Sequence, residues 1–210
     1  MSEGKTMSSG THPISLPAAD IPKASEMFAR TFHNYSMMTY LLPDSATRHS
    51  LLARSFQCLL WYGICYGEVR ATSADLEGVA IWLRPEAAHG SLVKMLRACL
   101  FRLPLIAGPR FFVRFLSYHQ RLDRLRREHT PFPHWYLQLL GVDPRHQGKG
   151  YGSSLVNPML ARLDSEQMPC CLDTMNVDNV AFYERFGFRI AAKSLVPKTQ
   201  LDLWLMARGD

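Results

Sequence analysis

Three glycines at alternate positions, Gly148, Gly150 and Gly152, lie in the stretch of the chain best suited to chemistry. A run of seven residues rich in aromatic and aliphatic side chains, 134–140, precedes them and ends at Gly141, Val142, Asp143 and Pro144, and apolar residues at helical spacing follow them. The predicted order is strand, glycine loop and helix. Because the first N–H groups of a helix have no partner within it and lie at the positive end of its dipole, such a loop can bind phosphate oxygens.

Two common phosphate loops do not match this spacing. A P-loop requires Gly, four residues, Gly, Lys and then Ser or Thr, whereas Lys149 is followed here by Gly150. A dinucleotide fingerprint requires Gly-x-Gly-x-x-Gly, whereas the glycines after Gln147 recur at every second position. The first interpretation fails and the second fits poorly, so another phosphorylated ligand is indicated.

The segment from Gln147 to Gly152, QGKGYG, resembles the Q/R-x-x-G-x-G/A signature of the GNAT superfamily of N-acetyltransferases. In that family the loop binds the pyrophosphate of acetyl-coenzyme A. The segment from Asn176 to Phe188, NVDNVAFYERFGF, resembles the family's N-x-x-x-Y-E-x-x-G-F helix and turn. Together the two motifs extend the resemblance over residues 134–192, whereas residues 12–83 are similar to the family only in pattern.

The resemblance implies a cofactor site made largely of main chain. The end of the strand would pair with the pantetheine arm, and the Val142 N–H would stabilise the oxyanion of the acyl transfer. The loop N–H groups would bind the pyrophosphate, with Arg145 and Lys149 supplying charge nearby. The cofactor-binding residues implied in this way are Leu140, Gly141, Val142, Gln147, Gly148, Lys149, Gly150, Tyr151, Gly152, Ser153, Asn176, Asn179 and Tyr183.

Tyr183 matches the family tyrosine that lies near the coenzyme sulfur. A phenol with a pKa near 10 keeps its proton at neutral pH and can give it to a departing thiolate. A tyrosine simply packed between helix and sheet is the alternative. The general base stays open among Glu77, His134, solvent and Asp173, of which Asp173 is the named candidate because it lies on the strand before Asn176.

The composition predicts one domain over residues 12–210, after a disordered polar tail over residues 1–11. The chain has 210 residues, of which 47% are hydrophobic. It shows neither a signal pattern nor an uncharged apolar run of about 20 residues, which predicts a cytoplasmic protein without a membrane span. Its five cysteines lack a C-x-x-C spacing, so no metal is expected and the cysteines are predicted to be apolar fillers.

The net charge of +6 suits an anionic partner such as coenzyme A. Nucleic acid is disfavoured, because the basic run from Arg121 to Arg127 alternates with leucines and lacks the aromatic side chains on which bases stack. We expect that run to be a solvated helix face. The arginines concerned are Arg121, Arg124, Arg126 and Arg127.

The alternation of predicted helices and strands indicates an α/β or α+β fold, with a mixed central β-sheet and helices on both faces. Residues 84–133 contain two helical stretches, about 91–103 and 109–128, which predict a helical insertion between the third and fourth strands that covers one side of the substrate cleft. Pro158 lies inside a predicted helix, which requires a kink or a later helix start. The region after residue 32 borders the acceptor pocket in the resembling family, so Tyr35, Met37, Met38 and Tyr40 are either pocket walls or core.

We therefore expect an acyl-coenzyme A N-acyltransferase that uses acetyl-coenzyme A and a small-molecule primary amine in a ternary complex. The YERFGF ending and the insertion resemble the small-molecule and antibiotic-modifying members, such as puromycin acetyltransferases. Two alternatives stay open: acetylation of a protein amino terminus or lysine, and a non-catalytic coenzyme A sensor. The sequence also leaves the oligomeric state open, a homodimer included.

Overall fold

The computed structural model describes residues 12–88 and 103–209. The expected disordered tail, residues 1–11, and most of the first helix expected in the insertion lie outside the described residues. Within the described part, no helix combines the length and the apolar character that crossing a membrane requires.

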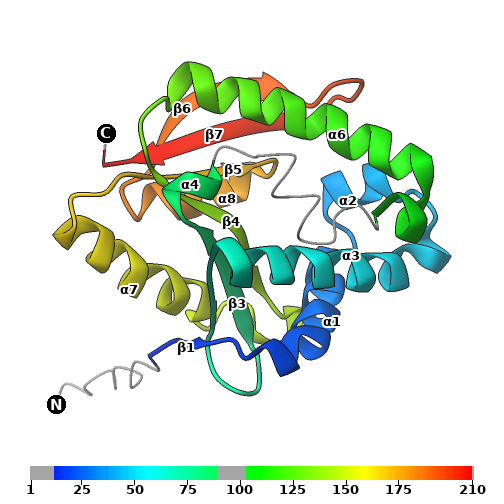
Figure 1. Cartoon of the computed structure of the whole chain (residues 1–210), viewed down its shortest axis with the longest axis horizontal. Coiled ribbons are helices and arrows are strands. Elements are labelled where there is room, and N and C mark those ends of the chain that lie inside the picture. Colours follow the sequence, from blue (N-terminus) through cyan, green and yellow to red (C-terminus); the bar gives the residue numbers. More distant parts are fainter. Residues whose placement is uncertain (1–11, 89–102, 210) are drawn as a thin grey trace, which may run out of the picture.

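A single sheet of seven strands, in the order β1-β2-β3-β4-β5-β7-β6, organises the described chain (Figure 1). All neighbouring strands are antiparallel except β4 and β5, which are parallel. The predicted mixed sheet is therefore confirmed. The strands are β1 Ile14–Ser15, β2 Gly67–Ala71, β3 Gly78–Leu83, β4 Trp135–Val142, β5 Cys170–Thr174, β6 Arg189–Leu195 and β7 Asp202–Arg208.

Helices cover both faces of this sheet, as predicted, because its central strands are apolar on both sides. Along β3, Val79 and Ile81 join a core cluster with α1, α2, α3 and α6, whereas Ala80 and Trp82 join a second cluster with α7 and α8. The helices are α1 Ile21–Phe32, α2 Ser36–Leu41, α3 Ser45–Tyr66, α4 Pro85–Ala88, α6 Leu103–His129, α7 Tyr151–Ser165 and α8 Val177–Glu184.

The insertion between β3 and β4 is helical where the structure describes it, and consists of α4 and α6. Gly108 interrupts α6 with φ +82°, and Pro109 follows, so the predicted start of the second helix coincides with this kink. Beyond the kink α6 runs along β7 and β6 (Figure 1). This part of α6 therefore lies over the sheet.

The parallel strands β4 and β5 separate after three paired positions, of which the last joins Leu137 to Leu172. On its other side β4 continues to pair with β3 as far as Val142, with an irregularity that leaves Gln138 as an extra residue. In the carboxyl-terminal half of β4, the edge that faces away from β3 therefore no longer pairs with β5. This is the position that the sequence assigns to the pantetheine arm.

The proline in α7 does not delay the helix. α7 begins at Tyr151 and continues through Pro158, which is exposed. Pro158 removes one main-chain donor, and its exposed position leaves the Ser154 carbonyl near the water side of the helix. Of the two accommodations expected, the later helix start is wrong.

Candidate active site

A cleft of about 620 Å³, which we call the cofactor cleft, opens where β4 and β5 separate. All of the expected cofactor-binding residues line it except Lys149. The sequence did not assign six further lining residues to the cofactor site, although it named Tyr35 as an acceptor-pocket wall. These six are Thr31, Phe32, Tyr35, His146, Phe182 and Arg185.

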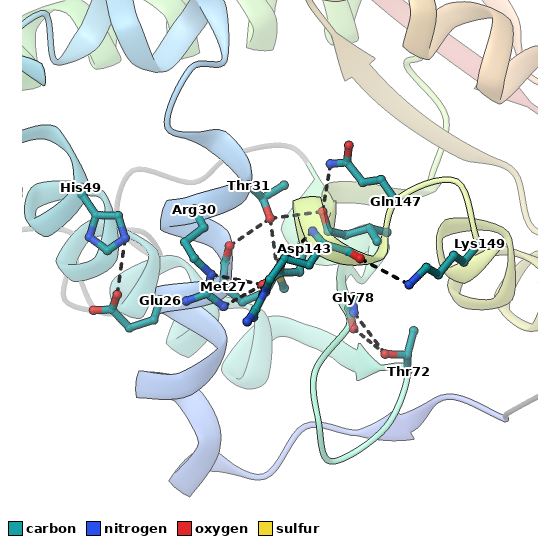
Figure 2. A network of polar contacts seen from close by, with 12 residues as sticks. Glu26, Met27, Arg30, Thr31, His49, Thr72, Gly78, Asp143, Gln147 and Lys149 are labelled. Carbon is teal, nitrogen blue, oxygen red and sulfur yellow. Dashed lines mark hydrogen bonds and ion pairs between the residues drawn. The ribbon is translucent and has the colours of Figure 1, made fainter.

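The direction of the main-chain groups at the end of β4 follows from Asp143, whose N–H donates to the Glu77 carbonyl at 2.8 Å on the β3 side. Because peptide groups alternate between the two edges of an extended strand, the N–H of Val142 points to the opposite edge, into the cleft. The Val142 carbonyl lies on that same edge, where it accepts from Gln147 Nε2 at 3.1 Å and Thr31 Oγ1 at 3.3 Å (Figure 2). The Val142 N–H is thus placed to contact a ligand.

Backbone conformation, rather than a lack of space, accounts for the glycines at positions 148 and 150. Gly148 has φ +76° and Gly150 has φ +86°, in the left-handed region, although an added Cβ would meet nothing within 4 Å at either position. Gly150 is the N-cap of α7. The N–H groups of the next three residues, 151–153, lie in the first turn of α7 and have no acceptor within the helix. A phosphate at this helix start would bind them.

A buried carboxylate fastens the turn before the loop to α1 (Figure 2). Asp143 is 1% exposed and accepts from the guanidinium of Arg30, at 2.7 Å and 3.1 Å, and from that of Arg145, at 2.9 Å twice. Hydrogen bonds from Arg145 and then Arg30 hold the pKa of Asp143 well below its usual range. Arg145 is therefore paired with Asp143, and the Lys149 ammonium lies 3.4 Å from the Arg145 carbonyl. Neither residue lines the cofactor cleft itself.

A second, smaller space of about 150 Å³, which we call the inner cavity, continues from the cofactor cleft on the side of α1, α2, α3 and α6. The two spaces share Phe32, Tyr35, Leu140, Asn179 and Tyr183 in their linings. Met37 and Met38, which the sequence offered as either pocket walls or core, line the inner cavity and also pack in the core cluster with α1, α3 and α6. Tyr40 instead lines a separate surface depression with Arg114.

Asp173 projects into the inner cavity from β5 and is held by two phenols. The Tyr118 hydroxyl donates to its Oδ2 at 2.5 Å, and the Tyr136 hydroxyl donates to its Oδ1. Burial raises the pKa of Asp173, while the Tyr118 hydrogen bond and the charge of Arg126 act in the opposite direction. The carboxylate therefore has a higher proton affinity than an exposed aspartate, which suits a general base.

Tyr183 stands where the two spaces meet and is 8% exposed. Burial raises its pKa far above the ordinary phenol value, and Tyr35 and the negative charge of Asp173 act in the same direction. Tyr183 therefore keeps its proton at neutral pH, as a proton donor to a thiolate must.

The two asparagines have different local tasks. Asn176 is the N-cap of α8, and its Oδ1 accepts from the Asp178 N–H at 3.0 Å. Asn179 donates to Thr174 Oγ1 at 3.2 Å. Thr174 therefore orients Asn179, and Asp173 is held by Tyr118 and Tyr136.

The other two candidate bases lie outside both spaces. The Glu77 carboxylate accepts from the hydroxyls of Thr72 and Ser73, each at 2.7 Å. His134 is fully buried, with its Nδ1 2.8 Å from the Phe132 carbonyl. Of the three titratable candidates, the structure places only Asp173 in the lining of the joined spaces.

The sequence predicted that the basic run on α6 is a solvated helix face, and this prediction is wrong for one of its arginines. Arg124 and Arg127 are exposed, but Arg126 is 2% exposed and lines the inner cavity. Its guanidinium lies over the Tyr136 ring at 4.4 Å and donates to the Ala88 carbonyl at 2.6 Å. Among the described cysteines Cys65 is exposed, so the prediction that the cysteines are apolar fillers is wrong for this residue.

Comparison with known proteins agrees with the resemblance to the GNAT superfamily that the two sequence motifs indicate. Residues 112–188 match the sequence model described as the Acetyltransferase (GNAT) family. An uncharacterized N-acetyltransferase of Schizosaccharomyces pombe is 29% identical over 183 residues, which cover 82% of this chain and 72% of that protein. Residues 112–188 are therefore similar to the acetyltransferase domain of the GNAT family, and most of the chain is similar to an N-acetyltransferase.

Two solved structures show the same fold. One, described as histone acetyltransferase HPA2 and related acetyltransferase from Corynebacterium glutamicum, aligns with a TM-score of 0.66 at 22% identity, over 94% of this chain and 96% of that chain. The other, arylalkylamine N-acetyltransferase 2 from Aedes aegypti, aligns with a TM-score of 0.61 at 16% identity, over 93% of this chain and 97% of that chain.

Proposed function

We propose that this chain transfers the acetyl group of acetyl-coenzyme A to the primary amine of a small molecule, by direct attack in a ternary complex. The observation that supports this most is that two spaces of different character share one wall. The cofactor cleft offers main-chain N–H groups to a phosphorylated ligand, and the inner cavity offers apolar side chains and a carboxylate. Tyr183 lies in that wall.

The residues fit the demands that coenzyme A makes. The free edge of β4 can pair with the amides of the pantetheine arm, and the N–H groups of the glycine loop and of the first turn of α7 can bind the pyrophosphate. His146 and Arg185 also line the cofactor cleft and can meet the remaining phosphate charge. Acetyl-coenzyme A supplies the activated thioester when bound.

Three groups of the chain then divide the chemistry. Asp173 accepts the proton that the amine loses, the Val142 N–H binds the oxygen charge that develops on the attacked carbonyl, and Tyr183 gives its proton to the departing thiolate. One well-aimed N–H donor contributes about 2.7–4 kcal/mol to such a step. A positioned proton donor contributes roughly 10²–10⁴ in rate.

The acceptor is proposed to be small because the inner cavity has a volume of only about 150 Å³ and is lined by residues of α2, α3 and α6. The two similar solved structures differ in their described acceptors, a histone for one and arylalkylamines for the other, so they do not decide the class. The resemblance to small-molecule and antibiotic-modifying members of the family agrees with the cavity.

Release of free thiol decides the proposal. Purified protein with acetyl-coenzyme A is mixed with a panel of small primary amines and, separately, with lysine-containing peptides. We expect small amines to accelerate thiol release and peptides to leave it near the background rate. If coenzyme A binds in calorimetry but no acceptor accelerates release, the chain acts as a coenzyme A sensor instead.

A further inference from the structure

The inner cavity limits the size of an acceptor. Its volume of about 150 Å³ is comparable to an engineered apolar cavity that holds benzene in another protein. The walls away from the cofactor cleft are aromatic and aliphatic, and include Phe56 and Leu59 from α3 and Phe115 from α6. Met37 and Met38 add flexible thioether side chains that adapt to irregular ligands. An apolar group the size of one ring or a short branched chain fits.

Tyr35, Asn179 and Tyr183 are the hydrogen-bonding residues that the inner cavity shares with the cofactor cleft, whereas Tyr118, His119 and Arg126 line the inner cavity and not the cleft. Asp173 interacts electrostatically with Tyr183 and with Tyr35. The polar end of an acceptor therefore belongs at the shared wall, where the thioester must also lie. An ammonium group beside Asp173 would regain the ion pairing that burial denies the carboxylate.

The remaining ionisable groups of the inner cavity disfavour a second charge on the acceptor. A carboxylate next to the amine would meet Asp173, which has the same sign. A second ammonium farther in would meet Arg126, which is fixed on the Tyr136 ring. His119 provides no compensating charge, because burial first and Arg126 second lower its pKa to about 3.

From these contacts we infer that the acceptor is a compact apolar monoamine, either an arylalkylamine or a short alkylamine, that binds as its ammonium ion beside Asp173. This inference rests on the proposed function and narrows its acceptor class. It assigns the size limit to side chains of α2, α3 and α6, and the charge limit to Asp173 and Arg126.

Matched amines test the charge limit. 2-Phenylethylamine and phenylalanine share a ring and a primary amine and differ by one carboxylate, while hexylamine and 1,6-diaminohexane differ by one ammonium. We expect kcat/KM to favour the monoamine by at least about tenfold in each pair, because an unpaired buried charge costs more than 1.4 kcal/mol. Equal or reversed preference in both pairs, with thiol release intact, would overturn the inference.

Matched variants test the size limit. Met38→Trp fills the inner cavity from α2, and Met38→Leu is its volume-conserving control; Met38 does not line the cofactor cleft. We expect Met38→Trp to lower kcat/KM for 2-phenylethylamine by at least about tenfold while the affinity for coenzyme A, measured by calorimetry, changes less than about twofold. Met38→Leu should lower kcat/KM much less than Met38→Trp does, because it changes the volume of the cavity less.

Phe115→Ala should have the opposite effect to Met38→Trp, because it enlarges the inner cavity instead of filling it. Phe115→Leu is its control. The enlarged cavity should shift the preference from 2-phenylethylamine toward 2-(1-naphthyl)ethylamine, an acceptor with one more ring. Unchanged ratios in both Met38→Trp and Phe115→Ala would show that acceptors bind elsewhere and would overturn the inference. The proposed function fails separately, when no amine at all releases thiol.

Discussion

The cofactor cleft and the inner cavity meet at the same break in the sheet, yet the chain builds them in different ways. Most of the residues that line the cleft come from two short segments, residues 140–153 and 176–185, and the first of these includes the glycine loop. The inner cavity consists of side chains from α1, α2, α3, β4, β5 and α6, which are far apart in the sequence. A fold built in this way can bind one cofactor with its main chain, while the choice of acceptor depends on individual side chains.

The wall common to both regions should be the most sensitive place in the molecule. Tyr183→Phe removes one oxygen and retains the packing of the ring against Phe182 and Phe188. We expect kcat to fall by roughly 10²–10⁴, because the thiolate loses its proton donor. The affinity for coenzyme A, measured by calorimetry, should stay close to that of the unaltered protein. Full activity of this variant would remove Tyr183 from the chemistry and leave it as a packing residue.

Asp173→Asn alters the inner cavity alone, and its activity should depend on pH in a defined direction. The amine proton can pass to Asp173 only while the carboxylate is ionised, so kcat/KM of the unaltered protein should fall as pH falls through the raised pKa of Asp173. The variant should lack that acidic limb and lose about 10² or more in kcat/KM. A variant that keeps the same acidic limb would show that another group is the base.

The same substitution should not weaken the fold. Burial raises the folded-state pKa of Asp173 above its ordinary value of 3.8, so the protonated acid is the form that folding favours. That contribution is complete below the unfolded-state pKa and is lost as pH rises through the folded-state pKa. At neutral pH we therefore expect the Tm of Asp173→Asn to equal or exceed that of the unaltered protein, and the difference to shrink in acid. A lower Tm at neutral pH would mean that the ionised carboxylate holds Tyr118 and Tyr136 in place.

The two regions also differ in how much of them the sequence could predict. Strand, glycine loop and helix follow one another within residues 135–165, so their geometry is local. Of the residues predicted for the cofactor cleft, Lys149 alone does not line it, but six further lining residues were not assigned to it. Lys149 was assigned to the cofactor site together with its neighbours in the loop, but its ammonium lies 3.4 Å from the Arg145 carbonyl and the residue does not line the cleft. A place in the loop does not by itself specify the direction of a side chain.

The inner cavity could not be predicted in the same way, because Tyr118 and Arg126 reach it from an insertion whose path over the sheet is not local information. One signal was present. Arg126 continues the helical spacing of Phe111, Phe115, Leu122 and Leu125, of which three are buried and Phe115 is half-buried. An arginine within an apolar stripe is a candidate for a buried role, and the neighbouring basic residues obscured it.

The main-chain character of the cofactor cleft predicts a contrast between two adjacent residues. Gly150→Val places a β-branched side chain at φ +86°, where L-residues lose about 1–2 kcal/mol, so coenzyme A should bind about tenfold more weakly. Lys149→Ala, the matched control, should change the affinity by less than about twofold, because surface ion contacts contribute little. Calorimetric titration with coenzyme A measures both. A larger effect at Lys149 would mean that side-chain charge, rather than main chain, binds the phosphates.

The smallest effect should arise where the two regions share support, at the contact between α1 and the turn before the glycine loop. Arg30→Gln removes one of the two guanidinium groups from Asp143, while Arg145 remains to pair with it. Since the pairing fixes the loop without touching the ligand, KM for acetyl-coenzyme A should rise about two- to fivefold with little change in kcat. Arg54→Gln, on the exposed side of α3, is the control.

The pH dependence of this variant separates positioning from a general loss of charge. The folded-state pKa of Asp143 lies below its ordinary value of 3.8, so its pairing stabilises the fold above that pH and the stabilisation is lost as pH falls through the folded-state pKa. The Tm of Arg30→Gln should therefore be lower than that of the unaltered protein at neutral pH and approach it in acid. A Tm difference that persists in acid would show that Arg30 stabilises α1 by packing, and the loop would then depend on Arg145 alone.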